Sequence, residues 1–190
     1  MIRRLVCAAA VLVIAPSAAW CQVSGWNIDG GVVWLTKSGS LHIGDGVFES
    51  DTGRAVRGRL KRGFGIAAVG LDVQTSSQKF GGTAPPSAPS SLSSTFVGLS
   101  ATVHPVTLMG LTPYGEVGLG RLFFSDERID EGGGVKATSY GVGVRLGLGP
   151  HFKIDGAFRV MQQKGLHVEG VADDLKYDPK LFSLMLSLEL

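Results

Sequence analysis

The sequence predicts an all-β fold, an eight-stranded antiparallel transmembrane β-barrel that follows a cleavable export signal. Three observations predict it: a basic and then apolar N-terminal segment, a recurring alternation of bulky apolar with small or polar residues, and connections that alternate between short and long. Alternation with a period of two is typical of a strand whose two faces meet different surroundings. We therefore treat residues 20–190 as one barrel domain.

Residues 1–19 have the features of a secretory signal peptide. Arg3 and Arg4 precede an apolar run from Leu5 to Ile14, and small residues follow the run. The run is shorter than the ~20 apolar residues that a membrane-spanning helix needs. We therefore expect the segment to be cleaved after export and not to serve as an anchor.

The composition suits a sheet in apolar surroundings. The chain has 28 glycines and 44% hydrophobic residues but only 18% charged residues, whereas soluble domains carry roughly 25% charged residues. A net charge of +2 creates no strong field, so no nucleic-acid partner is expected. Cys7 lies in the predicted signal peptide, which leaves Cys21 alone and excludes an internal disulfide.

Eight segments can each supply one strand. In residues 26–34 one parity carries two tryptophans and other bulky apolar side chains, and the other parity carries Asn27 and Asp29. The same alternation recurs in residues 67–74, 97–104, 116–120, 139–148, 152–160 and 182–190. The remaining strand is placed near Val47 to Leu60, where the alternation is weakest. Most of these segments approach the ~9–11 tilted residues that cross a bilayer.

The connections fall into two classes. Short turns are expected at residues 61–63, 105–111 and 149–150, and long polar loops at residues 36–46, 78–91, 125–134 and 165–179. Outer-membrane barrels have short periplasmic turns and longer extracellular loops. The bulky parity is expected to face lipid, while glycine, serine and charged residues fill a narrow interior. Because lipid leaves open strand edges unsatisfied, the last strand must close on the first.

These features resemble the OmpA/OmpX-type family of small outer-membrane β-barrels. The resemblance includes the segment Leu111–Tyr114 before a glycine-rich strand, Val117–Gly120, and the alternating strand at the C-terminus. It covers nearly all of the mature chain and implies location in the outer membrane of a Gram-negative-type cell. Its implied partners are outer-membrane lipids and, during assembly, the barrel-insertion machinery. Such proteins typically end in an aromatic residue, whereas this chain ends in Leu190.

Ten charged side chains are predicted to face the lumen. Five are acidic and five basic: Asp29, Arg57, Arg59, Asp72, Glu116, Arg145, Lys153, Asp155, Arg159 and Glu189. Since buried charges are costly unless paired, this balanced set predicts salt bridges that plug the lumen. Similar distances from their turns predict that Glu116 pairs with Arg145. The alternative is that these charges gate a narrow ion-conducting pore.

Aromatic and basic side chains are expected at the rims of the barrel. Five aromatic residues near strand ends are predicted to lie at the membrane interface: Trp26, Trp34, Phe124, Tyr140 and Phe152. The basic run of Arg54, Arg57, Arg59, Lys61 and Arg62 is expected to form a solvated rim. Contact of its lower end with anionic headgroups or periplasmic partners is the alternative.

Few residues suggest catalysis. His42, His104, His151 and His167 share no metal-ligand spacing, so neither a metal nor a cofactor is expected. Ser40 and His42 form the only close nucleophile and base pair, and no acid is tied to it. We expect a non-enzymatic barrel with a structural, envelope-integrity or surface-interaction role, whose four long loops could bind an extracellular ligand. A lipid-modifying barrel enzyme is the main alternative.

Overall fold

The computed structural model describes residues 23–36, 40–43, 46–81, 91–125, 134–163 and 179–190. These residues form ten strands, and none of them belongs to a helix long and apolar enough to cross a membrane. The predicted signal peptide, residues 1–19, lies outside the described residues. So do the central parts of three predicted loops, residues 82–90, 126–133 and 164–178.

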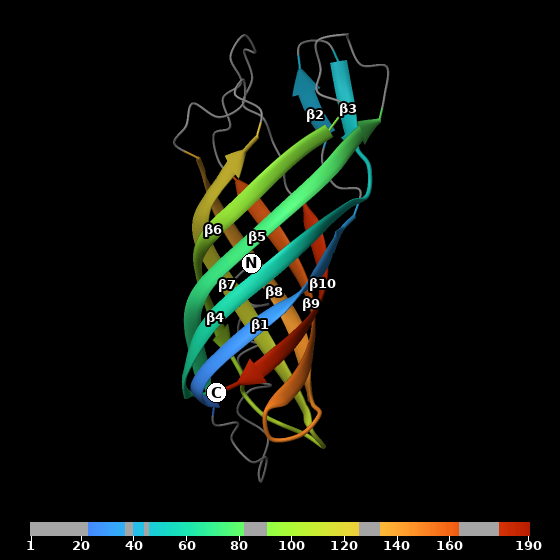
Figure 1. The fold of residues 1–190 in the computed structure, drawn as a ribbon. Helices are drawn as coiled ribbons and strands as arrows, with labels where there is room; N and C mark the ends of the chain where they lie inside the picture. Colours follow the sequence, from blue (N-terminus) through green and yellow to red (C-terminus); the bar gives the residue numbers. More distant parts are fainter. Residues whose placement is uncertain (1–22, 37–39, 44–45, 82–90, 126–133, 164–178) are drawn as a thin grey trace, which may run out of the picture.

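Eight of the strands close into an antiparallel barrel (Figure 1). Their bounds are β1 (Val23–Leu35), β4 (Gly53–Gly65), β5 (Ala67–Gly81), β6 (Ser91–Val103), β7 (Leu111–Phe124), β8 (Val135–Gly147), β9 (Phe152–Gln163) and β10 (Lys180–Glu189). Each of these strands pairs with the next along the chain, and β10 pairs with β1 over Asn27 to Leu35. The predicted fold class and its closure are therefore confirmed.

Two further strands extend beyond the barrel. β2 (Ser40–Ile43) and β3 (Gly46–Ser50) form a hairpin, and β3 joins the tip of β5 through Glu49 and Ser50 (Figure 1). The predicted loop at residues 36–46 thus contains a strand.

The strand predicted near Val47 to Leu60 is present but lies about five residues further along the chain, and the turn predicted at residues 61–63 is wrong. β4 runs from Gly53 to Gly65, and β5 starts at Ala67. The alternation of inward Arg57, Arg59 and Lys61 with outward neighbours continues through the predicted turn.

The two ends of the barrel differ. At the end that we call the turn end, strands are joined by the short connections at residue 66, residues 104–110 and residues 148–151. At the other, the loop end, the connections are longer, and the β2–β3 hairpin lies there, at the top of Figure 1. This asymmetry follows the predicted alternation of short and long connections.

The bulky parity faces outward on every barrel strand. Val142 is 64% exposed and Leu184 46% exposed, whereas Arg145 is only 3% exposed. No soluble sheet would present so continuous an apolar exterior, because exposed patches of this size mark contact with a membrane or a partner. The predicted orientation of the two faces is confirmed.

The interior has two layers. The turn-end half carries most of the charged side chains. The loop-end half is mixed and uncharged: buried apolar Val33, Leu35, Ala55, Phe96, Leu122, Phe124, Ala137, Met161 and Leu181 lie there with buried polar Gln74, Ser76, Gln78, Ser94, Ser139, Gln163 and Ser183. The sequence predicts only small and charged residues inside, so the buried apolar side chains are a correction. An eight-stranded barrel is narrow enough for side chains to fill, so its interior also accepts a core of ordinary apolar residues.

Candidate functional site

The charged half of the lumen is the candidate site. We call nine of its residues the central cluster: Asp29, Arg57, Arg59, Lys61, Asp72, Glu116, Arg145, Asp155 and Arg159. None is more than 3% exposed. They project from β1, β4, β5, β7, β8 and β9, since each occupies the inward parity of its strand.

Arg57 links neighbouring and opposite strands. Its Nη2 lies 2.5 Å from Asp72 Oδ2 and its Nε donates to Asp72 Oδ1 over 2.9 Å. Its Nη1 lies 3.2 Å from Glu116 Oε1. Arg159 Nη1 completes the surroundings of Asp72 at 3.1 Å from Oδ2. A two-pronged contact between guanidinium and carboxylate is a strong, directional form of ion pair.

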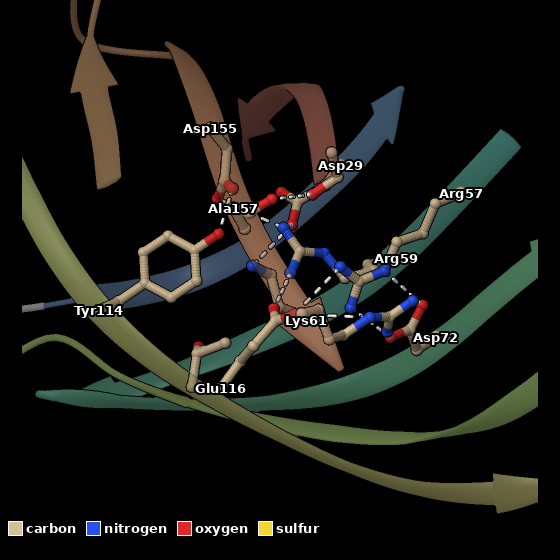
Figure 2. A network of polar contacts seen from close by, with 12 residues as sticks. Asp29, Arg57, Arg59, Lys61, Asp72, Tyr114, Glu116, Asp155 and Ala157 are labelled. Carbon is tan, nitrogen blue, oxygen red and sulfur yellow. Dashed lines mark hydrogen bonds and ion pairs between the residues drawn. The ribbon is translucent and has the colours of Figure 1, made fainter. Parts of the chain in front are cut away.

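Arg59 lies at the centre of the cluster (Figure 2). Its Nη2 is 2.9 Å from Asp29 Oδ2 and 3.3 Å from Asp155 Oδ2, and its Nη1 is 2.8 Å from Glu116 Oε2. These carboxylates come from β1, β9 and β7. One guanidinium of β4 therefore ties together side chains from both sides of the lumen.

The turn-end side of the cluster is held by Asp155. This carboxylate accepts hydrogen bonds from Arg145 Nη2 at 3.0 Å and from the Tyr114 hydroxyl. Nearby, Lys61 Nζ lies 2.6 Å from Asp29 Oδ2. Gly143 makes room for the Tyr114 ring, because a Cβ at that position would collide with it.

His104 lies below Tyr114, just after the last residue of β6. Its side chain is fully buried, its Nε2 is 3.1 Å from Thr102 Oγ1, and its ring centroid is 5.4 Å from that of Tyr114. Burial, and next the positive charge of Arg145, lowers the pKa of His104 from 6.5 to about 3. The imidazole is therefore neutral at physiological pH.

All ten charged residues proposed for the lumen point inward, but in two groups. Eight belong to the central cluster. Lys153 and Glu189 form a separate ion pair at the turn end, where their side chains are 21% and 23% exposed. Lys61 adds a sixth cation to the set, so the charges do not balance one to one.

The predicted pair of Glu116 with Arg145 was wrong. Glu116 lies opposite Gly141 on β8, and Arg145 lies opposite Thr112 on β7, four residues nearer the turn end. Two residues that are equally far from their turns along the chain need not lie at the same height along the barrel axis, because the strands of a barrel are tilted and staggered. Glu116 instead contacts Arg57 and Arg59.

The basic run does not form a single rim. Arg57, Arg59 and Lys61 are buried in the lumen, whereas Arg54 and Arg62 face outward near opposite ends of β4. Arg62 lies over the Trp26 ring, 5.6 Å from its centroid. The predicted alternation already places Arg57 and Arg59 inside, and the same alternation places Lys61 there.

Three functional residues were missed or misplaced. Tyr114 was not considered for the lumen, although it shares the parity of Glu116. His104 lies within the strand predicted at residues 97–104 and shares the inward parity of Ser100 and Thr102, yet it is absent from the predicted site. Lys61 follows the same parity as Arg57 and Arg59. For Tyr114 and Lys61, extending the alternation by one or two residues would have found the inward side chain.

Four of the five predicted interface aromatics face outward. Trp26, Trp34, Tyr140 and Phe152 are 40–50% exposed. Phe124 is 8% exposed and faces the lumen, and its neighbour Phe123 points outward instead. Tyr140 does not lie near a strand end as predicted, because β8 starts at Val135 and Tyr140 is its sixth residue.

The described residues show little that would support metal or nucleophile chemistry. Among them, no three His, Cys, Asp or Glu side chains are grouped so that they could hold a metal ion. Ser40 and His42, the pair considered as nucleophile and base, both lie in β2.

Comparisons with known proteins agree with this architecture. The family model named "Outer membrane protein beta-barrel domain" matches residues 5–189. The solved structure of Neisserial surface protein A is 16% identical, with a TM-score of 0.59 over 88% of this chain and 99% of that one. The outer membrane protein AlkL, solved in lipid bilayers, is 22% identical, with a TM-score of 0.53 over 93% and 95%. No curated protein matches the chain. At these identities the two structures are similar in fold alone.

Proposed function

The chain belongs to the outer membrane β-barrel domain family, and from this premise we propose that it is a non-enzymatic protein whose lumen is closed to ions. Its role is then structural or surface-binding: the barrel stabilises the envelope and holds the loop-end segments on the cell exterior. The short turns face the periplasm, as is usual for outer-membrane barrels. Extracellular ligands would meet the four long loops.

The observation that carries the proposal is the position of Arg59. Its guanidinium contacts carboxylates from β1, β7 and β9, so it lies across the lumen and not along the wall. Arg57 and Arg159 add contacts to Asp72 and occupy the same cross-section. Separating one of these buried charges from its partners costs several kcal/mol, which opposes spontaneous opening.

The loop-end interior supplies a second barrier. Phe96, Met161 and Leu181 are each at most 2% exposed and lie on the loop-end side of the central cluster, together with buried polar side chains such as Gln74 and Ser139. Side chains of both kinds fill the narrow lumen at this level. The ion-paired cluster and the filled loop-end interior favour a plugged barrel over a gated pore.

The lipid-modifying alternative receives less support. Such an enzyme needs a nucleophile beside a base at the surface where its lipid substrate lies. Among the histidines whose side chains the structure describes, His104 is buried near the turn end and His151 lies in a turn. Neither is near the loop end, where an outer-leaflet substrate would be reached; His42 does lie at that end, in β2 with Ser40.

Planar-bilayer recording tests the closed lumen. The purified, refolded chain should insert without producing discrete conductance steps, while an open porin in the same bilayer serves as the positive control. Reproducible steps that scale with salt concentration would refute the closed lumen. The second part of the proposal is that the protein is not an enzyme. Mass spectrometry of lipid extracts from cells with and without the protein tests it, and a new deacylated or acylated lipid would refute it.

A further inference from the structure

The central cluster contains one more cation than it has carboxylates. Its cations are Arg57, Arg59, Lys61, Arg145 and Arg159, and its carboxylates are Asp29, Asp72, Glu116 and Asp155. Each of these carboxylates already contacts at least two of the cations. A buried charge without a counter-charge is strongly unfavourable, so the cluster as a whole lacks one anion.

Lys61 lies at the turn-end edge of the cluster and keeps donors available. Its Nζ is 2.6 Å from Asp29 Oδ2, and the same oxygen is 2.9 Å from Arg59 Nη2 (Figure 2). Two cations therefore share one carboxylate oxygen. An ammonium has three N–H donors, and Asp29 is the only carboxylate that contacts Lys61 within the described residues. Donors remain on Lys61 for a further acceptor.

Asn27 lies beside Lys61 without a partner of its own. The two residues are directly opposite on β1 and β4, and such side chains are about 4.5–5.5 Å apart at Cβ. The Asn27 side chain is 1% exposed, and neither its Nδ2 nor its Oδ1 has a hydrogen-bond partner among the described residues. Leaving a buried amide unpaired is costly. Together, its N–H groups and the ammonium form a pair of donors that an anion would satisfy.

The turn-end side of this pair is open. Two residues nearer the turn end, on the same inward parity, Gly25 lies opposite Gly63. Neither carries a side chain, and Gly25 is exposed to solvent. The carboxylate of Glu189, which lies opposite Asn27 on β10, is paired with Lys153. A small anion can therefore reach the pair from the turn end without meeting an unpaired negative charge.

We propose that Lys61 and Asn27 bind one chloride ion in the turn-end part of the lumen. The ion accepts hydrogen bonds from Lys61 Nζ and Asn27 Nδ2, and its charge balances the additional cation of the central cluster. One negative charge is required, since a divalent anion would replace one imbalance with another. The site lies on the turn-end side of Arg59, so it needs no conducting lumen, and its test is separate from bilayer recording.

Urea unfolding in lipid vesicles tests the site. Sodium gluconate is replaced stepwise by sodium chloride at constant ionic strength, so that only the anion changes. An ion that binds the folded chain alone should lower the unfolding equilibrium constant roughly tenfold when its concentration is ten times its Kd. Bromide should act as chloride does, whereas gluconate is too large for a site of two side chains. Equal stability in chloride and gluconate would overturn the proposal.

The variant K61Q removes the additional cation, so its stability should no longer depend on chloride. The matched control is R62Q, because Arg62 is the next residue of β4 but faces outward; this variant should keep the full dependence. Chloride dependence that persists in K61Q, or that is lost equally in R62Q, would show that the ion does not bind at Lys61. Heat-dependent gel mobility, measured on every variant, reports folding separately, since a folded barrel migrates differently from its boiled form.

The variant N27A keeps every charge and removes only the amide. It should bind chloride about tenfold more weakly, because hydrogen bonds to charged groups are stronger than neutral ones. S100A is its control: Ser100 is also buried and its Oγ also has no hydrogen-bond partner among the described residues, but it lies on β6. If N27A and S100A bind chloride equally well, Asn27 is not a ligand. This comparison decides the proposal even where K61Q does not fold.

Bromide locates the ion directly. Crystals of the folded protein soaked in sodium bromide should give an anomalous scattering peak within hydrogen-bond distance of Lys61 Nζ and Asn27 Nδ2, and the peak should be absent from K61Q. Bromide peaks confined to the exterior of the barrel would contradict the site.

Discussion

At the scale of single residues, Glu116 shows how the cluster depends on charge. It contacts both Arg57 and Arg59. Replacing it with Gln keeps the shape but leaves two buried guanidiniums short of a counter-charge. We expect E116Q to lower the free energy of unfolding by roughly 3–5 kcal/mol, measured by urea unfolding in lipid vesicles with tryptophan fluorescence.

The matched control for this prediction is E189Q. Glu189 pairs with Lys153, but both side chains are partly exposed at the turn end. The same chemical change should therefore cost less than about 1 kcal/mol. Similar costs for E116Q and E189Q would mean that water reaches the central cluster, and the closed lumen would be refuted with them.

His104 predicts a dependence of stability on pH. Its pKa is about 3 in the folded chain and near 6.5 when unfolded. The unfolded chain therefore binds the additional proton between these values, and stability falls as pH drops below about 6.5. The difference in unfolding free energy between wild type and H104Q should shrink by roughly 1.4 kcal/mol per pH unit between pH 6 and pH 4. A constant difference would show that His104 is hydrated.

The sequence predicts which side chains point inward better than it predicts which ion-pair partner each of them contacts. Parity alone places Asp72, Glu116 and Asp155 inside, because a strand alternates strictly between its faces. Which cation each one meets depends on the stagger of strands far apart in the chain, and no local pattern carries that information. The wrong pair of Glu116 with Arg145 has this cause, whereas the parity of Glu116 already places Tyr114 inside.

At the scale of elements, the β2–β3 hairpin is separable from the barrel. It pairs with barrel strands only through Glu49 and Ser50 at the tip of β5 within the described residues. Leu35 of β1 already lies opposite Gly53 of β4, so residues 37–51 can be replaced by a tight Asn-Gly turn. We expect this variant to keep the heat-dependent gel shift and lose less than about 1 kcal/mol of stability. Loss of the shift would show that the hairpin is part of the folding unit.

The sequence predicts the bounds of a strand best where the two faces of the strand differ strongly in the size and polarity of their side chains. β8 and β10 alternate bulky with small or polar residues over most of their length. In β4 both faces carry basic residues, Arg54 and Arg62 outward and Arg57 and Arg59 inward. Charge then gives no contrast between the faces, and only the register with β1 and β5 fixes the strand and its turn.

At the scale of the whole molecule, closure decides whether the barrel exists. β10 pairs with β1 on one side and β9 on the other. β1 and β9 both run from the turn end to the loop end, so without β10 they would be parallel and could not pair as antiparallel neighbours. Removing one strand from an even-numbered antiparallel barrel therefore leaves two open edges in lipid.

Deleting residues 181–190 should consequently abolish the barrel in an all-or-none manner. Unpaired backbone groups in hydrocarbon cost several kcal/mol each, so the open edges exceed any stability the remaining strands supply. We expect the truncated chain to migrate at the same position with and without heating and to be digested by protease in vesicles. The variant with residues 37–51 replaced is the control, since it loses more residues but keeps all eight barrel strands. A truncated chain that still shows a heat-dependent shift would mean that β1 and β9 can close without β10.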